Sequence, residues 1–418
     1  MKSVCCQVAG LLAILVGCRT YEASPIDWEK EKSVWLEQGE LTFDSLDDVA
    51  KLTLLGNPDL NLMRMKRMSS ERIVRETGWW EDPELDVDLM RIVNPTENPL
   101  LGGASLSMTL PLSGVKGLER KSAEAYSAAD AADIIAAEQE TAGAARIAAL
   151  RYLSARETVL ALEAFERDSR INGVFATAER LSEVGELSKT ELVSARVRRH
   201  QRLHRRREAE TTAYESEQVL RRLMGIAPGV RLLFRECMRE QRSELSAPRD
   251  PLAYVRHPKV RAALCRLEGG EAALEAEIRR QYPDLKLGPA YSREEGLDRF
   301  GLVAGLTLPL WNRNRQGIAE AEGTRDEARQ TAVKVWREVV LEADAARRTL
   351  IRLKDHPPES SPNVEAADKL FDAGEIGVLD YLVLREEALD ADLMERDWRR
   401  DIRLAEENLK NSEWEENE

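Results

Sequence analysis

Two histidines four positions apart are the first residues whose spacing could support chemistry. His200 and His204 would lie on one face of a helix, an arrangement that can hold a metal ion. They lie in a basic run, residues 198–207, whose positive charge opposes a bound cation, and no glutamate completes an HExxH motif. We therefore predict no metal site. The run would form a solvated helix face, or contact an acidic partner or a neighbouring helix.

Other catalytic constellations are not visible in the sequence. Residues 114–117 read Gly-Val-Lys-Gly between a predicted strand and a predicted helix, but the GxxxxGK[ST] spacing of a phosphate-binding loop is missing. Neither a Ser-His-Asp set nor a Cys-His pair stands out, and the acidic residues fall on predicted helical faces. We predict that the protein is not an enzyme, has no catalytic residue and needs no cofactor.

The N-terminal cysteines suggest a site of lipid attachment. Lys2 precedes a mostly apolar stretch that is about as long as a secretory h-region and too short to span a bilayer. Residues 15–18, Leu-Val-Gly-Cys, resemble the lipobox of bacterial lipoproteins, in which the cysteine, here Cys18, becomes the first mature residue and carries the lipid. Arg19 follows, where lipoproteins of the inner membrane usually carry aspartate, so the resemblance implies the outer membrane. The alternative is an ordinary signal peptide with a coincidental cysteine.

Two cysteines would remain available in the mature chain. Cys5 and Cys6 leave with the signal peptide, and Cys237 and Cys265 would then lie in an oxidising compartment. A disulfide between them is possible there, although their spacing does not determine whether it forms.

The composition indicates long helices. Of 418 residues, 43% are apolar and 33% are charged, but only 5% are aromatic, which is few for a large globular core. Alanine, leucine, glutamate and arginine dominate, as expected for helices that pack through small residues. The formal net charge of −14 provides no general attraction to nucleic acid. An all-β secreted domain, a collagen-like fibre and a helical multi-span membrane protein are excluded.

Four sequence landmarks occur twice in the same order, which predicts an internal repeat. Asn-Pro at 57–58 is matched by His-Pro at 257–258, and Pro-Glu-Leu at 83–85 by Pro-Asp-Leu at 283–285. Leu-Pro-Leu recurs at 110–112 and 308–310, and an Xaa-Gly-Glu turn recurs around Gly185 and Gly374. Each copy reads as helix, strand pair, long helix, turn and helix. We place the copies at 45–230 and 251–412, after a signal peptide at 1–17 and a lipidated extension at 18–44, with a linker at 231–250 and an acidic tail at 413–418.

The strand pairs alternate with a period of two. The expected strands span about 84–93 and 103–111 in the first copy and 284–291 and 299–309 in the second. One face is apolar and the other is polar or small, and each strand is about as long as a tilted strand that crosses a bilayer. A half-buried hairpin on a soluble domain would fit the same alternation. If the strands do cross a membrane, several chains must pool them, because four strands cannot close a barrel and open edges cannot face lipid.

The helices are expected to be very long. No proline occurs between Pro111 and Pro228, and residues 115–184 read as near-continuous helix. Gly185 and Gly374 fall where the helices must reverse, and Ser188 is a suitable cap for the returning helix. Prolines within 356–362 predict a break in the second long helix.

These motifs together resemble the TolC-like outer membrane efflux protein family, in its lipoprotein branch. The most family-like string is Leu-Thr-Leu-Pro-Leu-Trp-Asn-Arg-Asn-Arg at 306–315, followed by Phe-Asp-Ala-Gly-Glu-Ile at 371–376. The resemblance covers roughly residues 45–412. It implies a mainly α protein with a small membrane β part, in which four strands per chain form a shared, trimeric, 12-stranded β-barrel. The long helices would continue this barrel as a periplasmic α-barrel.

The resemblance also implies partners and a constriction. Such homotrimers dock on a periplasmic adaptor protein, which connects them to an inner-membrane pump, here expected to be of the RND type. The family narrows its tunnel tip with acidic residues just after the glycine turn, a position matched by Asp380. Thr190 and Glu191 lie at the equivalent turn of the first copy, whereas Val383 replaces a second acid that some relatives carry. Asp380 could equally be a surface helix cap.

Three tryptophans flank the predicted strands. Trp79, Trp80 and Trp311 would lie where an aromatic belt meets the membrane interface, or would pack at the strand–helix joint.

We predict an outer-membrane channel of a tripartite efflux system, contacting outer-membrane lipid and no nucleic acid, in a Gram-negative-type bacterium. A duct for type I protein secretion and a lipid-anchored, coiled-coil periplasmic scaffold without a pore are the alternatives.

Overall fold

The computed structural model describes residues 21–36, 39–91, 100–235, 249–294, 297–306, 308–358 and 364–413. The chain forms two compact units, one of Met1–Thr42 and Ile226–Leu233 and the other of Phe43–Gly225 and Phe234–Glu418. The first unit holds α2 (Trp28–Leu36) and most of a two-stranded sheet of β1 (Glu40–Phe43) and β4 (Arg231–Phe234). The predicted signal peptide and Cys18 lie outside the described residues.

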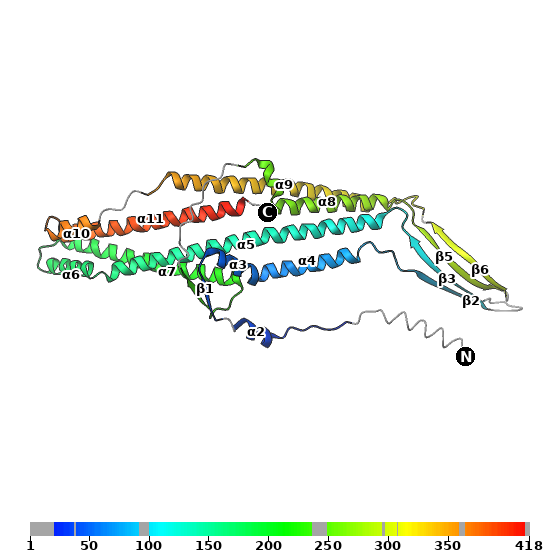
Figure 1. Cartoon of the computed structure of the whole chain (residues 1–418), viewed down its shortest axis with the longest axis horizontal. Helices are drawn as coiled ribbons and strands as arrows, with labels where there is room; N and C mark the ends of the chain where they lie inside the picture. Colours follow the sequence, from blue (N-terminus) through cyan, green and yellow to red (C-terminus); the bar gives the residue numbers. More distant parts are fainter. Residues whose placement is uncertain are drawn as a thin grey trace. The chain divides into compact units, whose positions relative to one another are not determined.

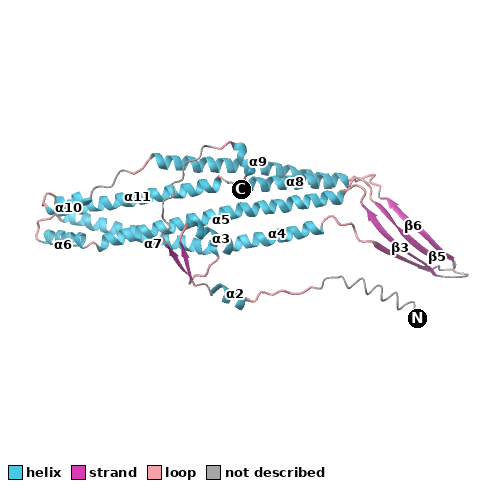
Figure 2. Cartoon of the chain, in the orientation of Figure 1, coloured by secondary structure: helices cyan, strands magenta, loops and turns pink. Residues whose placement is uncertain are grey.

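The larger unit is mostly helical, as predicted, and Figures 1 and 2 show its elements. Its first half contains α3 (Leu46–Gly56), α4 (Pro58–Glu76), β2 (Glu84–Arg91), β3 (Leu100–Leu110), α5 (Val115–Arg167), α6 (Ser169–Glu183) and α7 (Lys189–Met224). Its second half contains the 3₁₀ helix η2 (Pro251–Arg256), α8 (Pro258–Arg279), β5 (Leu285–Glu294), β6 (Leu297–Leu306), α9 (Arg315–Asp355), α10 (Val364–Asp372) and α11 (Val378–Ser412). None of the helices in the described ranges is long and apolar enough to cross a membrane.

The sheet of the larger unit is antiparallel, in the order β2-β3-β5-β6. Directly paired residues share a face of a sheet, so the register sorts the side chains. Leu85 pairs with Leu106, Met108 with Leu287, and Leu302 with Pro289, which places all of them on one apolar face. The opposite face carries Glu84, Asp86, Asp88, Ser105, Ser107, Lys286 and Arg299.

The apolar face of this sheet is uncovered in the single chain. Leu302 is 78% exposed and Phe300 is 84% exposed, and Leu85, Val87 and Leu89 are also open. Burying apolar surface is worth about 25 cal/mol per Å², so a face of this kind must meet lipid or another apolar surface.

The helices pack in the same order as the strands to which they connect. Beside the strands, α4 contacts α5, α5 contacts α8, and α8 contacts α9. Further along the chain's long helices, α7 contacts α5, α5 contacts α11, and α11 contacts α9. In the chain, β2 directly follows α4 and β6 directly precedes α9. Each edge strand of the sheet is therefore connected to one of the two outer helices, α4 and α9, of the helical row. The outer strands of the sheet and the outer helices of the row therefore lie on the same two sides of the larger unit.

The near-continuous helix predicted over 115–184 is present and is interrupted at one position. Asp168 has an extended backbone and separates α5 from α6. Its Oδ1 atom accepts hydrogen bonds from the backbone N–H groups of Arg170 (2.9 Å) and Ile171 (3.4 Å). A carboxylate that satisfies the free N–H groups of a new helix stabilises that helix start, and it interrupts the preceding one.

The two helix starts that the sequence repeat matches, at Asn57 and His257, use different capping residues. Asn57 Oδ1 accepts from the N–H group of Leu60 at the start of α4, whereas His257 Nδ1 accepts from that of Lys259 at the start of α8. His257 is buried, and burial, helped by the charge of Lys259, lowers its pKa to about 4. Only the neutral imidazole has a lone pair on Nδ1, so the cap requires the deprotonated ring.

Replacing His257 with asparagine should remove a pH dependence of stability. Between about pH 6.5 and pH 4 the unfolded chain binds a proton that folded His257 does not, so the wild type loses stability as the pH falls through this window. We expect a loss on the order of 2 kcal/mol, allowing for partial screening. His257→Asn keeps a cap that does not titrate, and denaturation midpoints at pH 7 and pH 4.5 should show a smaller difference. Equal differences in both proteins would contradict this role.

Candidate functional site

The two helix-reversing turns use left-handed glycines. Gly185 has φ +83° between α6 and α7, and Gly374 has φ +72° between α10 and α11. A side chain is strained at such a φ, so glycine suits both positions. Ser188 caps α7, as predicted: its hydroxyl accepts from the backbone of Thr190, and the Glu191 carboxylate accepts from the N–H group of Ser188.

The predicted constriction residues lie at these turns but are not joined to one another. Asp380 is exposed in the first turn of α11, and Thr190 and Glu191 are exposed in the first turn of α7. Within the described part of the chain, no hydrogen bond or ion pair connects Asp380 with either residue. Glu191 is occupied as part of the α7 capping box. Of the two predicted acids, only Glu191 is thus engaged in capping a helix in the described residues.

A network that the sequence did not reveal ties the α5–α6 break to α10 and α11, the two helices that flank the Gly374 turn. The guanidinium of Arg385, on α11, donates to Asp168 Oδ2 (2.8 Å) at the α5–α6 break and to both carboxylate oxygens of Asp368 on α10 (3.2 and 3.3 Å). Tyr381 donates its hydroxyl to Asp368 Oδ1 (2.7 Å). Asp168 therefore caps α6 with one oxygen and holds Arg385 with the other. We call Asp168, Asp368, Tyr381 and Arg385 the tip network.

An apolar cluster surrounds this network. Tyr381 is fully buried, and its ring stacks on Phe371 with centroids 4.4 Å apart. Burial, reinforced by the bond to Asp368, raises the pKa of Tyr381 to about 12, so its hydroxyl stays protonated and remains a donor. Phe165, Ile171 and Val174 of α5 and α6 pack against the same cluster. The cluster shields the ion pairs and so strengthens them.

A second arginine reinforces the connection between the two halves of the chain. Arg170, on α6, pairs with Asp372 on α10 and donates to the backbone oxygen of Asp368 (3.2 Å). This pairing raises the pKa of Arg170 and lowers the pKa of Asp372. Both side chains are solvent-accessible, so the pair contributes less than the tip network.

The basic run contacts neighbouring helices, which was one of the predicted alternatives. Arg198 and Arg202 pair with Glu386, and Arg205 pairs with Asp390, both on α11. Arg206 pairs with Glu166 on α5 at 2.6 Å. The run therefore helps to fasten α7 to the rest of the larger unit.

Solved structures of outer-membrane channels match this arrangement over nearly the whole chain. The Campylobacter jejuni CmeC outer membrane channel is 17% identical, with a TM-score of 0.65 over 95% of this chain and 93% of its own. The open-state Neisseria gonorrhoeae MtrE outer membrane channel is 13% identical, with a TM-score of 0.68 over 88% of each chain. A membrane protein from Pseudomonas aeruginosa is 18% identical, with a TM-score of 0.70 over 95% of this chain and 99% of its own. This chain has the TolC-like fold.

Comparisons at the level of sequence do not extend the TolC-like assignment. The chain matches no protein-family model and no curated protein sequence. At these identities the solved structures establish the fold, and the residues of this chain must carry any argument about its function.

The remaining predicted site residues of this TolC-like chain lie apart from the tip network. Trp79, Trp80 and Trp311 are exposed near the strand ends, and Trp79 Nε1 donates to the backbone oxygen of Arg75. Cys18 and Cys237 lie outside the described residues, and Cys265 has a free thiol. The aromatic belt and the disulfide stay predictions.

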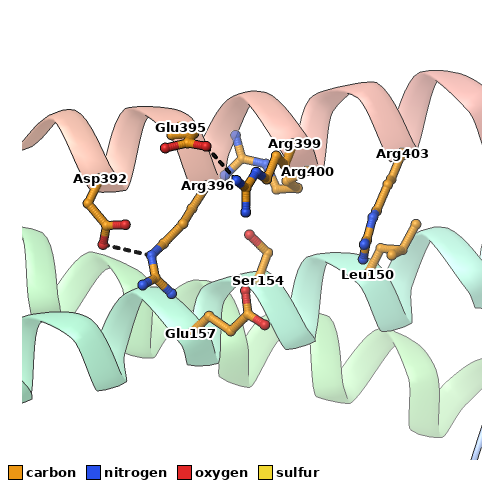
Figure 3. A pocket seen from close by; sticks show the side chains of 9 residues that line it. All are labelled: Leu150, Ser154, Glu157, Asp392, Glu395, Arg396, Arg399, Arg400 and Arg403. Atoms are coloured by element: carbon orange, nitrogen blue, oxygen red, sulfur yellow. Dashed lines mark hydrogen bonds and ion pairs between the residues drawn. The ribbon is translucent and has the colours of Figure 1, made fainter. Parts of the chain in front are cut away.

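A polar cavity between α5 and α11 was also not predicted (Figure 3). Its volume is about 310 Å³, and Leu150, Ser154, Glu157 and several arginines of α11 line it. Arg396 pairs with Asp392 at 2.8 Å, and Arg399 pairs with Glu395, each along α11 itself. Because these arginines already have carboxylate partners one turn away, the cavity offers little uncompensated charge.

Proposed function

We propose that the chain is a subunit of an outer-membrane channel in a tripartite efflux system. The observation that carries this proposal is the sheet, whose apolar face is exposed and whose other face is polar in a TolC-like fold. Its edge strands β2 and β6 have no further strand partner among the residues that the structure describes. Lipid would cover the apolar face, and water would fill the lumen on the polar face. A periplasmic scaffold without a pore would have no use for such strands.

The assembly we infer is a homotrimer. Open strand edges are not tolerated in lipid, because each unpaired backbone group costs several kcal/mol there. Since the edge strands and the edge helices fall on the same sides, one copy can close both layers against the next. Three copies of four strands would give a twelve-stranded barrel, and the long helices would continue it into the periplasm. The two halves of each chain would be copies of one repeat.

The partners and location follow from this proposal. The channel would be held in the outer membrane by lipid on Cys18 and would meet a periplasmic adaptor linked to an inner-membrane pump of the RND type. It would be a passive duct and not an enzyme. A protein-secretion duct would share the same fold, and the kind of pump genes beside its own gene would separate the two.

Planar-bilayer recording tests the pore directly. The purified protein should form a detergent-resistant oligomer that conducts ions, and a soluble, non-conducting monomer would contradict the proposal.

Asp380 should set the response of the pore to cations. In a closed ring of copies, its exposed carboxylates would attract cations and repel one another, as charged rings in pores do. We expect Asp380→Asn to weaken block by a multivalent cation about tenfold, because each charge near a narrow pore is worth on the order of 1 kcal/mol or more. Glu375→Gln, an exposed acid of the adjoining turn, is the matched control. Identical block in wild type and Asp380→Asn would remove Asp380 from the constriction.

A further inference from the structure

The two outer helices of the helical row, α4 and α9, can be followed in Figure 2. On α4, Ser70 faces α5, because its hydroxyl lies 3.4 Å from that of Ser127. On α9, Arg325 faces α8, because a Cβ atom added to Gly270 would lie 3.4 Å from the Cα atom of Arg325. Each outer helix therefore has a second face, turned away from its neighbour in the row, that another molecule can reach.

The outward face of α4 is an apolar stripe with positive charges beside it. Leu62, Met65 and Ile73 are 59%, 68% and 57% exposed, and residues three and eight positions apart share one side of a helix. Lys66 and Arg72 lie beside them, are exposed, and form no ion pair with another described residue. The stripe gains free energy when another apolar or small-residue surface covers it.

The outward face of α9 is shallow at its centre. Gly323 is exposed, and a Cβ atom added there would meet no atom within 4 Å in the single chain. Ala319, one turn before it, is also exposed and small. Small residues allow another chain to approach the helix backbone closely. Glu327, one turn after Gly323, is exposed and forms no ion pair with another described residue.

The charges of the two outward faces are complementary. The face of α4 carries two bases and one acid, and the face of α9 carries three acids and one base. These residues are Lys66, Arg72 and Glu76 on α4, and Glu320, Asp326, Glu327 and Lys334 on α9. Asp326 also pairs with Arg325, and Lys334 with Glu338, along α9 itself. The face of α4 is thus positive and that of α9 negative, whether or not these two internal pairs are counted.

The two outward faces lie at the same height above the sheet. Three contacts across the row join Ser70 on α4 to Arg325 on α9: Ser70 with Ser127, the ring of Tyr126 with Gly269, and Gly270 with Arg325. Since α4 runs toward the sheet and α9 runs away from it, residues after Ser70 and residues before Arg325 both lie nearer to the sheet.

This common level brings particular residues to matching heights. Ile73 and Gly323 lie three and two residues nearer to the sheet, so they differ in height by about 1.5 Å, the rise of one residue. Lys66 and Glu327 lie four and two residues farther from it, a difference of about 3 Å. A rotation that closes copies into a ring about an axis along the helices keeps these heights unchanged.

We propose that the outward face of α4 docks on the outward face of α9 in a second copy of this chain. Ile73 would lie over Gly323 of the next copy, and Lys66 would pair with Glu327 of the next copy. Two α4 faces would bring positive charges together and two α9 faces negative charges, so only unlike faces match and the contact continues around a ring. The inference rests on the proposed homotrimer and adds the side chains by which one copy recognises the next.

Filling the hollow of α9 tests the packing. In the full chain, Gly323→Leu adds a side chain where the single chain has open space, so the monomer should fold with unchanged helix content by circular dichroism. We expect the amount of detergent-resistant oligomer in the outer-membrane fraction to fall at least tenfold. The matched control is Gly117→Leu on the central helix α5, where an added Cβ atom also meets no atom within 4 Å, and it should leave the amount unchanged.

Exchanging the charges tests the pairing. We expect Lys66→Glu and Glu327→Lys each to lower the amount of oligomer about fivefold, because a ring repeats each new like-charge contact at every junction. The double variant restores opposite charges and should recover the wild-type amount to within twofold. Lys121→Glu, which reverses an exposed charge on the central helix α5, is the control and should have no effect.

Normal assembly of Gly323→Leu, or a double variant no better than the single variants, would overturn the proposal, since the α4 stripe would then be covered by a partner other than a second copy. Conductance of the same preparations is recorded separately. Rings that respond to the variants as expected but carry no current would refute the channel and leave the docking in place. Rings that conduct and ignore the variants would do the reverse, and a monomeric wild type would overturn both.

Discussion

Replacing Arg385 with glutamine should open the tip of the proposed channel. Glutamine cannot neutralise Asp168 and Asp368, so both carboxylates would lose the cation that lies between them. The side chain of Arg385 is 15% exposed, and hydrogen bonds to charged groups are worth about 1.5–3 kcal/mol each, so we expect a loss of roughly 2–3 kcal/mol. If the network holds a narrowed tip, a change of this size increases the open fraction by at least tenfold.

Two measurements check this expectation. Single-channel recording reports the open fraction, and limited trypsin cleavage at Lys369 reports loosening of α10, which Arg385 holds through Asp368, without depending on conduction. The matched control is Arg399→Gln, because the one ion pair of Arg399 among the described residues is with Glu395 on its own helix, and such exposed pairs contribute about 0.3–0.5 kcal/mol. If Arg385→Gln behaved like this control in both measurements, the tip network would have no part in closing the channel.

An arginine on the apolar face of the sheet should abolish assembly in the membrane, whereas its neighbour should be tolerated. Leu302 and Val303 are adjacent on β6 but lie on opposite faces, opposite Pro289 and Gly288 respectively. An arginine facing lipid near the bilayer midplane costs about 2–4 kcal/mol per chain, and a trimer carries this cost three times. An arginine at position 303 would lie on the polar face of the sheet and face water. Its partner across the strands is Gly288, which has no side chain and leaves space for the arginine.

The quantity to measure is the amount of detergent-resistant oligomer in the outer-membrane fraction. We expect Leu302→Arg to leave less than about a tenth of the wild-type amount, because each 1.4 kcal/mol changes an equilibrium tenfold. Val303→Arg should leave most of it. Equal tolerance of both changes would favour a soluble hairpin, the alternative that alternation alone does not exclude, and equal loss would contradict the assignment of the two faces.

Local patterns allowed much of the fold to be predicted from the sequence. The alternation of apolar and polar residues places Leu302 and Val303 on opposite faces because side chains in a strand alternate, whatever lies around it. Gly185 and Gly374 mark the turns because only glycine adopts a left-handed φ without strain. Ser188 and Glu191 form a capping box within four residues. Each of these features depends only on residues that are close together in the sequence, so the sequence of a single chain is enough to predict it.

The tip network could be identified only from the tertiary structure. Arg385 and Asp168 are 217 positions apart, and nothing in either segment identifies the other. The break at Asp168 had a weak local signal, an aspartate followed by serine, but uninterrupted helix competed with it over the same residues. The choice between a solvated basic run and a run fastened to α11 was likewise open until the packing placed Arg202 beside Glu386.

The sequence by itself determined the kinds of element, their order and the two faces of the sheet, because short-range backbone and side-chain geometry decides these features. Only the tertiary structure decided which charges meet and that the edge strands connect to the edge helices. It also decided that Asp380 makes no hydrogen bond or ion pair with Thr190 or Glu191 in the described part of the chain. The reason is that an ion pair between distant helices depends on their packing register. A shift of one turn, about 5.4 Å, would bring different side chains together without changing any local pattern.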